Sequence, residues 1–328
     1  MAYSVKTYYH KQELPPMEVG NFFHYPSSFD WYSHTPIYTP FMLIAFDKDQ
    51  PVAALFAIIV RKNRFFSHSL FKRCIISQQP AFFGGDLPQI ELFDLLITRL
   101  VQEVKQKVFL IRYENLGNAI FGYKGFRANH FYSVKWINIR NSLQRRRKLW
   151  DQLTPSRKNQ VNRALKKGVQ IEEMLSEKEL PEIYQLIRNT NQKKIRRRFP
   201  PYAYLECFFH HYVKKGKGKI LLTRYQGKII GGAILGYEKK ETVFCLYYWG
   251  KSKRYKLLYP TIFTLYTAMQ RSEEEGFLFF DFMDVGFLHK NSGRSRFLLQ
   301  FGGKQKATRR WYRFNWSLLN FFANRIYD

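Results

Sequence analysis

The sequence predicts an α/β (α+β) chain of two tandem domains, each a mixed, mostly antiparallel sheet flanked by helices. Three apolar runs separated by turns are followed by a helix-length segment and a fourth apolar run, which gives the order βββαβ. That order occurs twice, and residues 51–56 of the first copy align with residues 229–234 of the second. Chance similarity between two α/β stretches is the alternative, and duplication accounts better for the shared order.

The second copy shows the pattern most clearly. Residues 219–250 hold three runs rich in β-branched and aromatic residues, with a Gln226-Gly227 turn after the first run and a charged turn at 238–241 after the second. We expect a helix from Tyr259 to Glu275 and a fourth strand from Phe277 to Phe282.

The first copy begins with residues 41–60, which place a polar turn between two apolar runs, and a third run follows near 72–77. We expect a helix from Ile90 to Val104 and a fourth strand from Val108 to Tyr113. The aromatic residues 1–40 are expected to form an arm that packs on this domain.

Composition bounds the kind of protein. The 328 residues are 45% apolar and 18% aromatic, which favours two packed domains over disorder. Lysine and arginine number 54 against 25 acidic residues, so the formal charge is +29. Such an excess repels itself in a compact fold unless an anionic partner offsets it. The charge therefore indicates a polyanionic substrate.

The cysteines and the apolar segments indicate the compartment. Cys74, Cys207 and Cys245 lie in apolar stretches without CxxC or Cys/His spacing, which predicts buried thiols in a reducing cytoplasm and no metal site. The N-terminal residues have no apolar core of the signal-peptide kind, and the longest apolar run, residues 51–60, is too short to span a membrane. We expect a cytoplasmic protein, with the inner face of the membrane as the alternative.

The C-terminal segment bears on that alternative. Trp311, Trp316, Phe321 and Phe322 lie among basic residues, a pattern that suits contact with a membrane surface. The simpler interpretation is a helix that closes onto the core of the second domain.

Residues 140–168, between the two copies, hold ten basic residues and a single acid. Thr154 and Pro155 make a good N-cap and first-turn pair and Gly168 a good stop, so a basic helix is expected at 154–167. Its expected apolar stripe is Val161, Ala164 and Leu165, and its expected charged surface is Arg157, Lys158, Arg163, Lys166 and Lys167.

Basic clusters recur at residues 193–198, 214–219, 251–256 and 304–313. A charge run is usually a solvated face, but several of these runs fall at expected ends of strands or helices, where α/β folds place binding loops. Arginine offers a planar fork to phosphate oxygens, and lysine offers a mobile point charge. Phosphate-bearing substrates therefore suit this surface.

These residues carry a resemblance to a known family. The basic helix reads R-x-x-x-(I/V)-x-(R/K)-A-x-x-x-G-V, and later pieces are GKIIGG at 227–232, YYWG at 247–250 and FGG at 301–303. In this order, over about residues 41–314, the pieces resemble the FemABX group of acyltransferases, whose members consist of two GNAT-like domains. The signature residues of the helix are Arg157, Val161, Arg163, Ala164, Gly168 and Val169.

The resemblance implies one GNAT-like domain at residues 1–150, with the arm, and another at 151–328, with the basic helix. It also implies transfer of an acyl or aminoacyl group to an amine. Well-known family members take an amino acid from aminoacyl-tRNA and attach it to a peptidoglycan precursor that carries diphosphate, and both substrates are polyanions. The implied donors are aminoacyl-tRNA, acyl-CoA or an acyl carrier protein, with no tightly bound cofactor.

Two departures from the family pattern matter. Where the family often has Phe-Lys-x-x-Phe-Gly, with the Lys in the substrate site, this chain has Leu298, and the nearby Arg296 would point to the other face of a strand. Ordinary GNAT enzymes hold the pyrophosphate of acetyl-CoA on a glycine-rich loop at a helix N-terminus, and residues 250–255 lack that glycine pattern. The loop alone therefore does not predict acyl-CoA binding.

The implied chemistry is attack of an amine on an ester or thioester carbonyl, which needs a deprotonated amine and a polarised carbonyl but no protein nucleophile. The catalytic candidates are Asp281, at the end of the expected fourth strand, and Tyr248, near the end of the third. Their alternatives are a strand-end carboxylate that caps an amide and a core tyrosine. The phosphate-binding candidates are Arg157, Lys158, Arg163, Lys193, Arg196, Lys251, Ser252, Arg254 and Arg296.

The main hypothesis is thus an acyltransferase that acts on an amine of a phosphate-bearing cell-envelope precursor or lipid. One alternative is an acyl-CoA-dependent N-acyltransferase on a small amine. Another is a non-catalytic nucleic-acid-binding protein that uses the same basic clusters.

Overall fold

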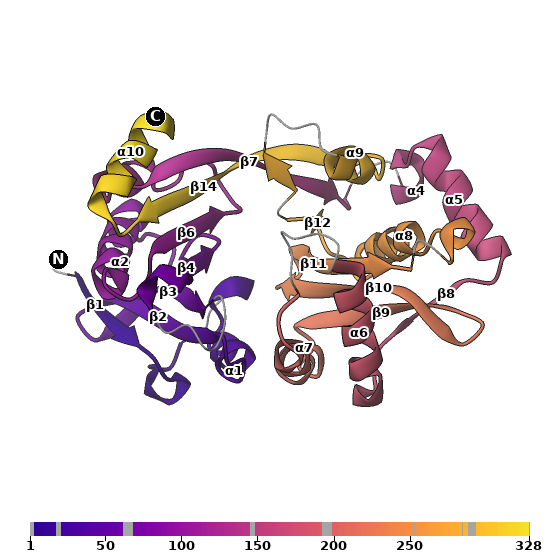
Figure 1. Ribbon diagram of the computed structural model, residues 1–328, viewed down its shortest axis with the longest axis horizontal. Coiled ribbons are helices and arrows are strands. Elements are labelled where there is room, and N and C mark those ends of the chain that lie inside the picture. Colours follow the sequence, from indigo (N-terminus) through magenta and orange to yellow (C-terminus); the bar gives the residue numbers. More distant parts are fainter. Residues whose placement is uncertain are drawn as a thin grey trace. The chain divides into compact units, whose positions relative to one another are not determined.

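The computed structural model describes residues 3–17, 21–61, 68–144, 148–191, 199–251, 254–283, 285–287 and 293–327. The chain forms two compact units, Met1–Ile137 with Ala307–Asp328, and Asn138–Lys306 (Figure 1). The boundaries fall inside two strands, β7 (Tyr132–Ser142) and β14 (Lys304–Phe314). This differs from the expected division at residue 150, because the last strand and helix of the chain belong to the first unit.

The sheet of the first unit has the order β1-β2-β3-β4-β6-β14-β7. β4 and β6 are parallel, and the pairs from β1 to β4 and from β6 to β14 are antiparallel. The βββαβ order expected for the first copy is confirmed, and residues 3–8 of the expected arm add an edge strand. The bounds are β1 (Tyr3–Tyr8), β2 (Tyr38–Asp47), β3 (Gln50–Arg61), β4 (Lys72–Ser77), β5 (Ala81–Phe82), which pairs with β3, and β6 (Leu110–Asn115).

Alternation along β2 sets the two sides of this sheet. Phe41, Leu43 and Ala45 share one core with helix α2 (Gln89–Val104), and Met42 and Ile44 share another with helix α1 (Ser27–Ser33). The remaining helices of the unit are α3 (Tyr123–Ala128) and α10 (Ser317–Tyr327), with the short turns η1 (Lys11–Glu13), η2 (Phe22–His24) and η3 (Ser69–Phe71).

The sheet of the second unit has the order β7-β12-β11-β10-β9-β8. β11 and β12 are parallel, and the other pairs given by register are antiparallel. This confirms the second βββαβ copy. The bounds are β8 (Gln170–Glu173), β9 (Gly218–Tyr225), β10 (Lys228–Glu238), β11 (Thr242–Gly250), β12 (Phe279–Asp281) and β13 (Gly286–Phe287), which pairs with β7.

The expected basic helix is α5 (Pro155–Lys166), which ends before Gly168 at φ +77°. Thr154 stands at the N-cap, but its side chain makes no capping hydrogen bond. Leu165 is exposed and therefore does not join the expected apolar stripe. The other helical segments of this unit are α4 (Leu149–Gln152), η4 (Glu177–Glu179), α6 (Leu180–Asn191), α7 (Tyr202–Phe208), η5 (Phe209–Val213), η6 (Lys256–Leu258), α8 (Pro260–Glu274) and α9 (Gly293–Leu299).

The three cysteines are buried free thiols, as expected. Within the described parts of the chain, every helix is too short or too polar to cross a bilayer.

Candidate functional site

The strand β11 changes direction where its pairing with β12 stops. β12 pairs with Thr242, Val243 and Phe244 of β11, and β11 then continues from Cys245 to Gly250. At that point the register with β10 shifts, because Ile234 faces Tyr247 while Leu235 faces Cys245. Leu246 is thus the extra residue of a β-bulge, and bulges bend a strand away from its neighbour. In the part of the chain that the structure describes, no strand pairs with this edge of β11 beyond Phe244.

The corresponding pair of strands in the first unit has no such opening. β4 pairs with β6 up to its last residue, Ser77, which faces Glu114. The described pairing of β4 with β3 also has no register shift. An unpaired strand edge that can present backbone N–H groups to a substrate carbonyl is therefore a feature of the second unit.

Asp281 ends β12 beside the opening and is buried, with 1% of its surface exposed. Its Oδ2 accepts a hydrogen bond from Nε of Arg140 at 3.1 Å, and its Oδ1 accepts one from the backbone N–H of Met283 at 2.7 Å. Burial raises the pKa of Asp281, while Arg140 and the Met283 amide oppose that rise. The contact with Met283 is the amide cap considered from the sequence, and the ion pair with Arg140 adds a second role.

Two further charged groups interact with this ion pair. Burial and the nearby Glu241 raise the pKa of Glu238 to about 7, and the charge of Arg140 opposes this. Burial and the charge of Arg140 lower the pKa of Lys306, and Asp281 opposes that shift. A carboxyl group with a pKa of about 7 can accept and return a proton near neutrality, so Glu238 has the property of a general base.

The sequence reasoning missed Arg140, Glu238 and Lys306. The sequence predicts a charged turn at 238–241, and a residue in such a turn is usually solvated. The signal that identifies it is the strand before it: Ile229–Tyr237 is apolar without alternation, which indicates a strand buried on both faces. A polar residue that directly follows such a strand, as Glu238 does, is therefore expected to be at least partly buried.

Tyr248 lies on the segment of β11 that runs past β12. It is half-buried and faces Ala233 of β10. The guanidinium of Arg294 lies 5.7 Å from the centre of its ring. The tyrosine is therefore neither a fully buried core residue nor a free surface residue.

The loop between β11 and α8 carries the expected basic side chains Lys251 and Arg254. Lys251 is half-buried and Arg254 is exposed. Close packing fixes where this loop begins, because a Cβ on Gly250 would lie 2.3 Å from Oγ1 of Thr261 in the first turn of α8. Tyr259 enters the helix with φ +49° and precedes Pro260 at its first position. The loop thus holds cations beside the N-terminus of a helix, where anions are favoured.

The basic helix α5 packs against α8 and against η6, so its cations and those of the loop belong to one neighbourhood. Arg163 is exposed there. Lys158 lies 3.9 Å from Oδ1 of Asp151. Arg157, a predicted phosphate-binding residue on the charged surface of the helix, is buried instead: it is 6% exposed, and its guanidinium lies 4.5 Å from the ring centre of Phe297. Its guanidinium donates to Gln160, and burial lowers its pKa.

The segment around Leu298 is a helix and not the strand expected from the sequence. Leu298 and Arg296 both belong to α9, where Leu298 is fully buried and Arg296 is exposed. Of the remaining phosphate-binding candidates, Lys193, Arg196 and Ser252 lie outside the described residues.

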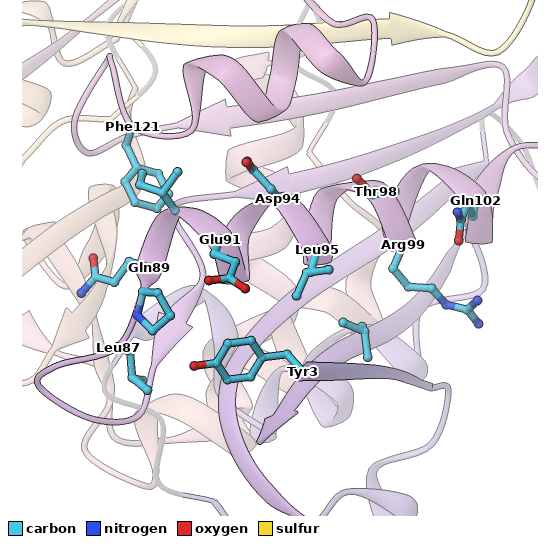
Figure 2. A pocket seen from close by; sticks show the side chains of 13 residues that line it. Tyr3, Leu87, Gln89, Glu91, Asp94, Leu95, Thr98, Arg99, Gln102 and Phe121 are labelled. Carbon is cyan, nitrogen blue, oxygen red and sulfur yellow. The ribbon is translucent and has the colours of Figure 1, made fainter. Parts of the chain in front are cut away.

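The first unit contains a groove of about 1120 Å³ between β1 and α2. Figure 2 shows Tyr3 on one side of it and Glu91, Asp94 and Leu95 of α2 on the other. Burial raises the pKa of Asp94. No sequence-predicted site residue lines this groove, which we therefore separate from the site on β11.

Comparison with known families identifies the second unit. Residues 155–291 match the family model described as "Acetyltransferase (GNAT) domain". The match begins at the first residue of α5 and includes the bulged strand, α8 and Asp281. The second unit therefore contains a GNAT-type acyltransferase domain, and the chain is an acyltransferase.

Comparison with solved structures extends the fold to the whole chain. FemX has 12% sequence identity and a TM-score of 0.64, covering 92% of this chain and 94% of that one. A tandem GNAT protein from the clavulanic acid biosynthesis pathway has 8% identity and a TM-score of 0.58, covering 95% and 99%. L-PGS from Bacillus licheniformis has 14% identity and a TM-score of 0.57, covering 84% and 86%. No curated protein matches by sequence. The fold is the FemABX-like tandem GNAT fold.

Proposed function

We propose that this protein transfers an aminoacyl group from aminoacyl-tRNA to an amine of a phosphate-bearing cell-envelope precursor or lipid. The observation that carries the proposal is the unpaired edge of β11, which begins beside Asp281. Glu238, whose carboxyl group has a pKa of about 7, ends β10 opposite Thr242 and interacts with Asp281 through its charge. An amine acyl transfer needs these two elements, a donor for the carbonyl oxygen and a base for the amine.

The reaction proceeds in two steps. The amine nitrogen attacks the ester carbonyl, and a backbone N–H of the Cys245–Gly250 edge stabilises the oxyanion that forms. The C–N bond forms as the amine proton passes to the carboxylate of Glu238. The C–O bond then breaks, and Glu238 returns the proton to the departing hydroxyl of the donor. Asp281, being buried, holds Arg140 in place and does not touch the substrate.

The preference for tRNA over acyl-CoA rests on the loop before α8. The backbone N–H of Lys251 donates to the carbonyl of Ile230, and that of Tyr255 donates to the carbonyl of Lys251. Because these two amides already donate to carbonyls of the protein, this loop has fewer free N–H groups for the pyrophosphate of acyl-CoA than the loop of an ordinary GNAT enzyme. The exposed cations Arg163 and Arg254 remain for phosphates, and they suit the long anionic backbone of a nucleic acid. Acyl-CoA and an acyl carrier protein are the alternative donors.

The fold is the basis for proposing an envelope precursor or lipid as the acceptor of the aminoacyl group. FemX and L-PGS share this fold, and an envelope precursor or lipid with a phosphate group suits the charge of +29. The proposal places the reaction in the cytoplasm, where aminoacyl-tRNA is available.

The test is a transfer assay with charged tRNA, acyl-CoA and acyl carrier protein as donors, and with nucleotide-linked muropeptides and phosphatidylglycerol vesicles as acceptors. We expect transfer from aminoacyl-tRNA, a loss of roughly 10²- to 10⁴-fold in Glu238→Gln, and no loss in Glu182→Gln, which changes an exposed glutamate of α6. If transfer is seen from acyl-CoA and from no other donor, acyl-CoA and not aminoacyl-tRNA is the donor of this enzyme. Binding of tRNA without transfer to any acceptor would support a nucleic-acid-binding protein and refute the proposal.

A further inference from the structure

The helix α10 packs on the first unit with most of its apolar side chains exposed to solvent. Leu318, Phe321, Phe322 and Ile326 expose between 53% and 76% of their surfaces. With 3.6 residues per turn they lie on one side of the helix, with Arg325 among them. A surface helix normally has the opposite orientation, so this face is a candidate for an interaction.

Polar residues hold the inward side of α10. Asn320 is buried, accepts a hydrogen bond from the backbone N–H of Phe314, and donates to the carbonyl of His130. Asn324 donates to the same carbonyl and accepts from Arg127. The expectation that this helix closes onto the second core is therefore wrong, because its bonds go to the first unit. They also fix its orientation, so that the apolar face is built into the structure.

Aromatic residues with polar groups stand at both ends of the helix. Trp316 directly precedes α10 and packs edge-on against Phe109, with 57% of its surface exposed. Tyr327 ends the helix and stacks on Tyr132. Tryptophan and tyrosine favour the boundary between lipid chains and head groups.

The segments that contact α10 and its base are rich in basic residues. α10 follows Asn315, whose side chain bonds to the carbonyls of Val104 and Val108 at the end of α2. The stretches 97–131 and 307–327 hold two acidic residues, Glu103 and Glu114, and each is paired with basic side chains. Against these two stand the basic residues Arg99, Lys105, Lys107, Arg112, Lys124, Arg127, Arg309, Arg310, Arg313 and Arg325.

We propose that the outward face of α10 docks on an anionic phospholipid surface, with its apolar side chains below the head groups and Arg325 reaching the lipid phosphates. A second copy of the chain fits this face less well. Two molecules of charge +29 repel each other. One helix of 11 residues also offers a narrow strip rather than the area that a stable dimer needs.

The test uses the full chain and sucrose-loaded vesicles, of phosphatidylcholine alone or mixed with phosphatidylglycerol. We expect sedimentation with the mixed vesicles, weakening with added salt. The double variant Phe322→Ser/Ile326→Ser should bind at least about tenfold more weakly, since two exposed side chains lose their insertion. The matched control is Leu165→Ser/Leu175→Ser, which removes two equally exposed apolar side chains from the second unit and should bind normally.

The measurement needs no transfer activity, and the comparison of the two double variants separates docking by α10 from any binding of phosphatidylglycerol as an acceptor. The proposal is overturned if the unmodified protein stays in the supernatant with mixed vesicles at low salt. Equal weakening by both double variants, or equal binding to both vesicle types at all salt concentrations, also overturns it. Light scattering that shows a dimer, converted to monomer by Phe322→Ser/Ile326→Ser, would assign the face to a second copy instead.

Discussion

Replacing Glu238 by glutamine should stabilise the protein, and the gain should grow with pH. Burial raises the pKa of this carboxyl from 4.5 to about 7 in the folded state. Between these values the folded state binds more protons than the unfolded state, so stability falls as pH rises. Glutamine has no charge to desolvate and escapes that loss.

The size of the effect follows from the shift. Linkage gives a penalty on the native protein of about 1 kcal/mol at pH 5, rising to about 3 kcal/mol at pH 8. Oε2 of Glu238 has no hydrogen-bond partner among the described residues, so the amide that replaces the carboxyl group breaks no existing bond there. The variant should therefore gain about 2 kcal/mol relative to the native protein between pH 5 and pH 8.

Urea unfolding of both proteins at several pH values from 5 to 9 measures this difference, provided that the m-values agree. Glu182→Gln should change stability by less than about 0.5 kcal/mol at each pH, because that residue is exposed. A gain from Glu238→Gln that is the same at pH 5 and pH 8, or a loss that deepens with pH, would refute the burial argument and remove the case for a general base here.

Two further substitutions and one labelling measurement test the same unit. Arg140→Gln should cost about 3 kcal/mol in urea unfolding, because it leaves the carboxylate of Asp281 buried without its charged partner, and adding Asp281→Asn should recover part of that loss. Gly250→Ala should lower stability by about 1–3 kcal/mol, with partial recovery in combination with Thr261→Ala, because the new Cβ meets the Thr261 hydroxyl; an unchanged melting temperature would contradict this packing. Burial raises the pKa of Cys245, so a thiol reagent should label it at the rate of unfolding, and fast labelling of the folded protein would show that the thiol is accessible.

The repeated order of strands and helices could be predicted because each strand and helix has its own local pattern. The meander at 218–250 and the helix α8 need no distant partner to be recognised. The pairing of β14 with β6 could not be predicted, because a strand that mixes basic and apolar residues without regular alternation does not specify which sheet it joins. The sequence placed it in the second domain for lack of any signal.

The positions of the candidate residues on the strands could be predicted from the sequence, and their surroundings could not. Tyr248 and Asp281 do stand at the opening of β11 and β12, since strand ends are visible in the sequence. The burial of Arg157, a predicted phosphate-binding residue, could not be predicted, because composition does not reveal that a guanidinium stacks on Phe297. The bulge at Leu246 had no signal, because the residues on both sides of it are apolar.

The assignment of β14 to the first unit has a consequence for synthesis on the ribosome. In that unit β14 lies between β6 and β7, and its Trp311 is fully buried. The nascent amino-terminal half therefore lacks an internal strand of its own sheet until residues 307–314 are translated. Residues 138–306 are complete earlier, so the later-encoded unit is able to mature first, and truncation before residue 307 should leave the amino-terminal half aggregation-prone.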